Sequence, residues 1–225
     1  MADGHDGAAA PVPLDDAVAQ TRTGDIWLFR GESAADLMIR TFTNAPVNHV
    51  GMAVVIEDLP PLMWHAELGQ SLPDVWTGTR HRGVQLHDLR DAVLVWAQRY
   101  GQRAWFRQLQ AEVTPAMEDA VLRTVARLDG TPFPKTAQLA ARWALGRLRQ
   151  PAPLEQTYCA ELLATTYSAM GLLGADRPAN YYDPGRFWSG DELDLRGGAV
   201  LGPEIAVDVP PMYVARPGVT DRTGP

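Results

Sequence analysis

The chain has 225 residues, of which 46% are hydrophobic and 21% charged, and this composition indicates one compact domain with short tails. The formal net charge is −7, and no cluster of Lys and Arg residues is interleaved with aromatic residues, so we do not expect nucleic acid as a partner. The single cysteine excludes an intramolecular disulfide and a cysteine-rich zinc fold.

The two ends of the chain predict tails around a single domain. Residues 1–22 are rich in Ala, Pro, Gly and Asp, residues 216–225 contain Pro, Gly and polar residues, and both predict mobile segments around a domain over 23–215. The N-terminal segment lacks the basic start and apolar core of a signal peptide, and no run of about 18 apolar residues predicts a transmembrane segment. We therefore expect a cytoplasmic protein.

The first half of the domain predicts strands and one helix. A buried strand is expected over 26–29 and a helix over 33–43, where Ser33 caps the first turn. Two further strands, 48–57 and 62–69, flank the turn at 58–61 and predict an antiparallel pair.

The second half predicts two more strands followed by helices. Strands are expected over 83–89 and 104–110, with a short helical or irregular segment between them. Helices are expected over 114–130, where Thr114 is the cap, and over 136–150 and 157–171. A loop at 177–191 contains a short helix from Pro184, and weaker strands are expected over 204–209 and 212–215. Clustered strands with separate helices indicate an α+β fold.

Cys159 lies at the start of the helix predicted over 157–171. Leu162, Leu163, Thr166 and Met170 follow it at helical spacing, so the cysteine is expected to face inward on the first turn. Free backbone N–H groups at a helix start favour an anion, which lowers the pKa of a thiol and makes it more reactive. The alternative is that Cys159 is a small buried packing residue.

A base for this thiol is expected among the histidines of the first antiparallel strand pair. His49 and His65 have the same parity, and across an odd-length turn they share one face of the sheet with Glu67. Of the other histidines, His81 is expected in a polar loop and His87 on a half-exposed strand beside Asp88.

The order of five segments, GDIWLF, NHVGMAVV, MWHAE, GVQLHDL and TYCAELL, resembles the NlpC/P60 papain-like superfamily. It is similar to the circularly permuted YiiX/YebB-like branch, which includes a poxvirus member, because the histidine strand precedes the cysteine helix. The resemblance covers roughly residues 24–190. It implies a permuted papain-like fold, in which an antiparallel sheet packs against helices including the cysteine helix, and it implies no cofactor.

The resemblance also implies residue roles. Cys159 corresponds to the nucleophile, His49 to the base, and His65 to the orienting residue of a Cys-His-His/Glu triad. Two departures are that CAEL replaces the family's CSEL and that His65 replaces the Glu usual in the permuted branch. Glu67 is the alternative orienter, since the expected register places it nearer His49, although the motif alignment favours His65.

These assignments predict a cysteine hydrolase that forms a thioester intermediate. The bond it cleaves is expected to be an amide, peptide, ester or thioester, and acyl transfer to another acceptor is a variant of the same reaction. Its substrate is expected to be a small-molecule, lipid or peptide acyl compound. The backbone N–H of Cys159 is expected to hold the oxyanion, with Gln156 or Tyr158 as a second donor. Glu161 is expected to be a structural carboxylate that bonds a backbone group or an arginine.

Two other classes of function remain open. A catalytically inactive papain-like domain that only binds a partner is compatible with the same residues. A zinc site made by Cys159, His49, His65 and Glu67 has suitable ligand chemistry, but it lacks the closely spaced ligand pairs of structural zinc sites. We therefore expect no metal.

Overall fold

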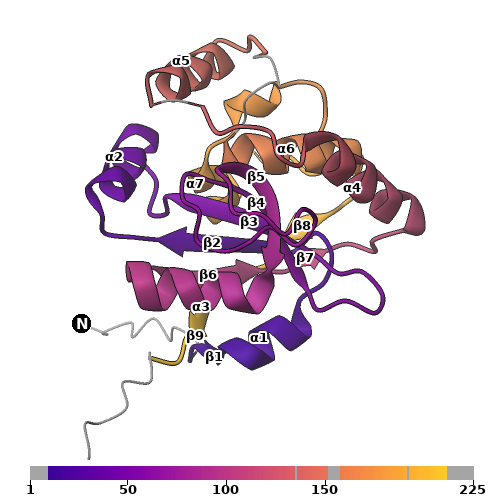
Figure 1. Ribbon diagram of the computed structural model, residues 1–225. Coiled ribbons are helices and arrows are strands. Elements are labelled where there is room, and N and C mark those ends of the chain that lie inside the picture. Colours follow the sequence, from indigo (N-terminus) through magenta and orange to yellow (C-terminus); the bar gives the residue numbers. More distant parts are fainter. Residues whose placement is uncertain (1–9, 135, 152–157, 192, 212–225) are drawn as a thin grey trace, which may run out of the picture.

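The structure is a computed structural model that describes residues 10–134, 136–151, 158–191 and 193–211. A seven-stranded sheet in the order β1-β9-β6-β2-β3-β4-β5 forms its centre (Figure 1). Neighbouring strands are antiparallel except β1 and β9, which are parallel. The strands are β1 (Val12–Pro13), β2 (Ile26–Arg30), β3 (His49–Val54), β4 (Leu62–Glu67), β5 (Gly83–Asp88), β6 (Arg103–Arg107) and β9 (Ile205–Asp208). A second, two-stranded sheet joins β7 (Leu109–Gln110) and β8 (Val200–Leu201).

Helices pack on both faces of the large sheet, which confirms the predicted α+β class. The predicted caps are present, since the hydroxyl oxygens of Ser33 and Thr114 accept backbone N–H groups of their own helices. The helices are α1 (Leu14–Gln20), α2 (Ala34–Thr43), α3 (Leu89–Tyr100), α4 (Pro115–Leu128), α5 (Thr136–Arg147), α6 (Cys159–Ala169), the 3₁₀ helix η1 (Ala179–Tyr181) and α7 (Pro184–Ser189). Within the described ranges, no helix is both long and apolar enough to cross a membrane.

Several elements differ from the sequence-based expectation. Residues 12–20, expected in the N-terminal tail, form β1 and α1, because Leu14 and Ala17 are buried in the core beside α3. The segment expected to be short or irregular is the 12-residue helix α3, whose first turn is capped by the side chain of Asp88. The strand expected at 212–215 and the tail at 216–225 lie outside the described residues.

The alternation of side chains along β3, β4 and β5 divides the core into two layers. Even-numbered residues such as Val50 and Trp64 face α6, and we call this side the α6 face. Odd-numbered residues such as Met63 face α3, and we call this side the α3 face. The indole N–H of Trp64 donates to Oγ1 of Thr166 over 3.1 Å, which anchors α6 on its face. Whether a residue on these strands has an even or an odd number therefore decides whether its side chain faces α6 or α3.

Candidate functional site

Cys159 is the first residue of α6 and is 5% exposed on the α6 face. The backbone N–H groups of Val50, Ala160 and Cys159 itself lie near enough to Sγ to lower the pKa of the thiol. The ladder between β3 and β4 covers Met52–Val54 opposite Leu62–Trp64 and stops before Val50. The predicted position of the thiol at a helix start is thus confirmed, and the end of β3 supplies a further donor.

Burial raises the pKa of the Cys159 thiol to about 11, although the three backbone N–H groups oppose this effect. The sequence-based expectation was a lowered pKa, because a helix start favours an anion. In the described arrangement the loss of water around the sulfur outweighs the helix terminus. The thiol is therefore protonated at neutral pH.

His49 begins β3 and lies on the α3 face, opposite to Cys159. Its ring meets Trp96 edge-on at 5.0 Å between ring centroids and lies 5.8 Å from Phe29. Burial lowers the pKa of His49 to about 3, with a smaller contribution from His87. Its Nε2 is buried without a hydrogen-bond partner among the described residues. The structure therefore does not bring this imidazole to the thiol.

His65 and Glu67 share the α3 face with His49, so the predicted parity of the two strands is confirmed. The rings of His49 and His65 meet edge-on at 5.4 Å, but no hydrogen bond joins them. Continuing the register from Met52 opposite Trp64 by three residues would set His49 opposite Glu67, yet the ladder ends before that point. The zinc set that included Cys159 is likewise not brought together.

The Glu67 carboxylate, at the end of β4, is hydrogen-bonded to the loop after β4 and to α3. Oε1 accepts the backbone N–H of Ser71 over 2.9 Å, and Oε2 accepts the Ser71 hydroxyl over 2.9 Å and the Trp96 indole N–H over 3.2 Å. Trp96 packs on His65 at 4.7 Å as well. One helix residue thus covers the histidines and holds the carboxylate beside them.

His87 is a member of this group that the sequence analysis placed on a half-exposed strand. It is fully buried, and its Nδ1 lies 3.1 Å from Nε2 of His65. Burial lowers the pKa of His87 to about 4 and holds the pKa of His65 well below its ordinary value. Gln85, paired with His65 across the strands, is also fully buried. The alternation in GVQLHDL predicts that Gln85 and His87 share one face of the sheet. The burial of that face depends on α3, which the alternation does not reveal.

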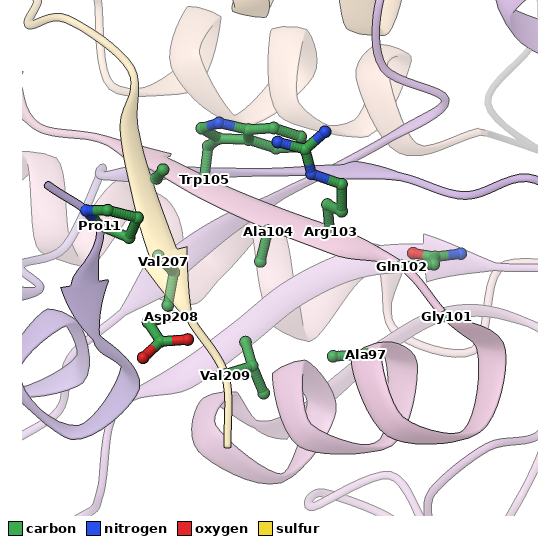
Figure 2. Close-up of a pocket in the computed structure, with 11 residues that line it drawn as sticks. Pro11, Ala97, Gly101, Gln102, Arg103, Ala104, Trp105, Val207, Asp208 and Val209 are labelled. Atoms are coloured by element: carbon green, nitrogen blue, oxygen red, sulfur yellow. The ribbon is translucent and has the colours of Figure 1, made fainter. Parts of the chain in front are cut away.

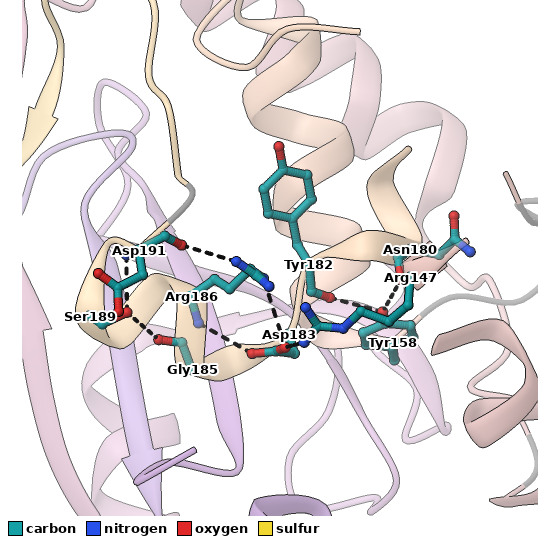
Figure 3. A network of polar contacts seen from close by, with 9 residues as sticks. All are labelled: Arg147, Tyr158, Asn180, Tyr182, Asp183, Gly185, Arg186, Ser189 and Asp191. Carbon is teal, nitrogen blue, oxygen red and sulfur yellow. Dashed lines mark hydrogen bonds and ion pairs between the residues drawn. The ribbon is translucent and has the colours of Figure 1, made fainter. Parts of the chain in front are cut away.

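The residues around α6 have structural partners. The Tyr158 hydroxyl donates to the carbonyl oxygens of Asn180 and Tyr182, both at 2.9 Å, and Figure 3 shows it within the polar network beside α7. Glu161 binds Arg142 of α5, which confirms that it pairs with an arginine. Gln156 lies outside the described residues. Tyr158 is therefore engaged with the 180–182 segment.

A pocket of about 370 Å³ lies where β6, β9 and the end of α3 meet. Figure 2 shows Arg103, Trp105 and Asp208 among its lining residues. None of the predicted catalytic residues lines it. The pocket is therefore separate from both Cys159 and the histidines.

Comparison with known proteins finds similarity to a solved structure. No family model and no curated protein matches the chain. The crystal structure of metalloprotein yiiX from Escherichia coli O157:H7 (DUF1105) is similar over 68% of this chain and 68% of that chain, with 18% sequence identity and a TM-score of 0.46. That protein has the name of the YiiX/YebB-like branch that the sequence motifs resemble. At these values no residue role follows from the match.

Proposed function

We propose that this protein is a cysteine-nucleophile hydrolase that cleaves an amide, ester or thioester through a thioester on Cys159. The observation that supports the proposal is the position of Sγ at the start of α6, where the backbone N–H groups of Val50, Ala160 and Cys159 lie near enough to lower the pKa of the thiol. Such donors stabilise a thiolate, and a carbonyl oxygen brought to this place acquires the same donors as its negative charge develops.

The chemistry runs in two steps. The base takes the proton of the thiol, the sulfur forms a bond to the carbonyl carbon, and the electron pair of the C=O bond moves to the oxygen. When this pair returns, the bond to the amine, alkoxide or thiolate breaks, and the leaving group takes a proton from the base. Water then attacks the thioester and releases the acid, so Cys159 is regenerated.

We propose His49 as the base and His65 as the residue that orients it, through the edge-on contact of their rings. The described arrangement is then a resting state, because the His49 ring and Sγ lie on opposite faces of the sheet. Neighbouring side chains of a strand point to opposite faces, so rotation of the side chain alone does not bring the ring across. Activity through this pair requires a change in backbone conformation at the start of β3.

A second candidate is a papain-like binding domain without catalysis. It is favoured by the buried thiol, whose pKa of about 11 keeps it protonated, and by the position of His49 behind the sheet. In this case Cys159 is a packing residue of the α6 face, and its neighbours serve stability alone.

The pH dependence of alkylation by iodoacetamide separates the two candidates. Cys159 is the only cysteine, so the modification reports on this thiol alone. The hydrolase proposal expects a reaction well below pH 8.5, the ordinary pKa of a cysteine, which His49→Ala abolishes and His81→Ala in the loop after β4 leaves intact. A rate that rises only toward pH 11, and equally in all three proteins, refutes the proposal and favours the binding domain. A positive result is followed by amide, ester and thioester substrate libraries.

A further inference from the structure

Three side chains on the α3 face place metal-ligand atoms close together. His65 and Glu67 come from β4 and His87 from β5, and all three are buried. One ligand atom from each lies within 4.8 Å of the others. Side chains two residues apart on one strand face the same side, and β5 is the hydrogen-bonded neighbour of β4, so the sheet itself sets this grouping.

Buried polar atoms without partners surround the same three side chains. Among the described residues, Nδ1 of His65, Nε2 of His87 and both amide atoms of Gln85 form no hydrogen bond. The backbone carbonyl of Leu72 is near enough to raise the pKa of His87 slightly, but it does not complete a hydrogen bond with that ring. Native interiors rarely leave such groups unsatisfied, so this part of the core holds more polar capacity than the described residues use.

The distance between the two closest nitrogens suits a shared metal ion. Nε2 of His65 and Nδ1 of His87 lie 3.1 Å apart. Two nitrogens bound tetrahedrally to one Zn²⁺ at about 2.05 Å are separated by roughly 3.3 Å, so the spacing suits the ion once the rings turn their lone pairs from each other toward it. Both rings then use a lone pair for the metal in place of the hydrogen bond between them.

The carboxylate already has the outer hydrogen bonds that metal ligands usually have. Ser71 and Trp96 donate to Glu67 and fix the plane of its carboxylate, while Oε1, which accepts one of these bonds, retains acceptor capacity. The edge-on contact of Trp96 with His65 fixes one ring in the same way. Orientation of ligands by such partners is a common feature of built metal sites.

We propose that His65, Glu67 and His87 bind one divalent transition-metal ion of the zinc type beneath α3. Two imidazoles and a carboxylate form a ligand set that suits Zn²⁺ and its neighbours in the first transition row. The ion joins β4 to β5, and through Trp96 it also connects to α3. Cys159 lies on the opposite face and takes no part, and His65 is the one residue that this proposal shares with the hydrolase proposal.

Calorimetric titration of the tag-free full chain with Zn²⁺, after removal of metals by a chelator, tests the site. We expect one ion per chain and a higher melting temperature with Zn²⁺. His87→Gln and Glu67→Gln remove ligands, so each should weaken binding by more than the roughly 10- to 100-fold that is typical of losing an outer partner. Cys159→Ser and His81→Gln are the controls and should bind as the original chain does. Circular dichroism checks that each variant is folded.

X-ray absorption of the zinc-loaded original chain gives a second readout that needs no variant. We expect a shell of nitrogen and oxygen ligands with the scattering pattern of imidazole. A sulfur ligand places the ion at Cys159 and overturns the proposal. The absence of stoichiometric binding, or binding that survives both ligand substitutions, overturns it as well.

Discussion

Arg142 of α5 and Glu161 of α6 form a buried two-point ion pair, in which Nη2 lies 2.7 Å from Oε1 and Nε lies 3.3 Å from Oε2. The Glu161 side chain is 1% exposed, so its charge is almost fully removed from water. The pair joins the two helices directly behind the start of α6, where Cys159 lies. A carboxylate in this place therefore has a structural role that does not require contact with a substrate.

Substitution Glu161→Ala should destabilise the fold strongly, because it leaves the Arg142 guanidinium buried without this partner. We expect the free energy of unfolding, measured with urea, to fall by about 3–5 kcal/mol. The matched control is Asp119→Ala, which removes the partner of Arg123 in an exposed pair at 4.0 Å and should change this energy by less than about 0.5 kcal/mol. Similar losses in the two variants would contradict the structural role.

Substitution Tyr158→Phe should lower stability without changing the reactivity of the thiol. The hydroxyl donates to the carbonyl oxygens of Asn180 and Tyr182, so its removal leaves two buried acceptors without that donor. We expect a loss of about 1–2 kcal/mol in the free energy of unfolding and an unchanged pH profile of Cys159 alkylation. Tyr100→Phe, at an exposed tyrosine, is the control and should change neither quantity. A changed alkylation profile at full stability would instead assign Tyr158 a direct part in the site.

The local patterns of the sequence were sufficient for most of the elements around the site. Alternation and β-branched residues predicted the strands that became β3 and β4, and their shared parity placed His49 and His65 on one face. Helical spacing after Cys159 predicted the inward position of the thiol on the first turn. These features depend on residues that are only a few positions apart in the chain, so they can be predicted from a single sequence.

The side of the sheet that each helix covers could not be predicted in this way. Parity decides which residues share a face, but both faces of β3 are apolar, so the pattern does not say which one receives α6. The separation of Cys159 from His49 arises from this choice. The burial of His87 was missed for a related reason, because it depends on α3, a helix that the sequence analysis did not recognise in full.

The buried histidines should make the metal-free protein less stable as the pH falls. Burial lowers the pKa of His49 to about 3 and of His87 to about 4, whereas in the unfolded chain both titrate near 6.5. Between about pH 6.5 and pH 4 the unfolded chain therefore binds more protons than the folded protein, and the free energy of unfolding falls with falling pH. Each such histidine contributes a slope that approaches about 1.4 kcal/mol per pH unit.

Urea unfolding of the chelator-treated protein between pH 7 and pH 4.5 measures this slope, and His87→Asn isolates one residue. Desolvation is the largest influence on the pKa of His87, followed by Asp74, which raises it, and His81. The variant should lose stability at pH 7 and show a slope smaller by the contribution of one proton, because one titrating group is gone.

Thr166→Val is the control, since it removes the bond to Trp64 on the α6 face and introduces no titrating group. It should lower stability equally at every pH in this range. If His87→Asn has the slope of the original chain, His87 takes up its proton in the folded protein over the same pH range as in the unfolded chain, and its burial does not exclude the charge.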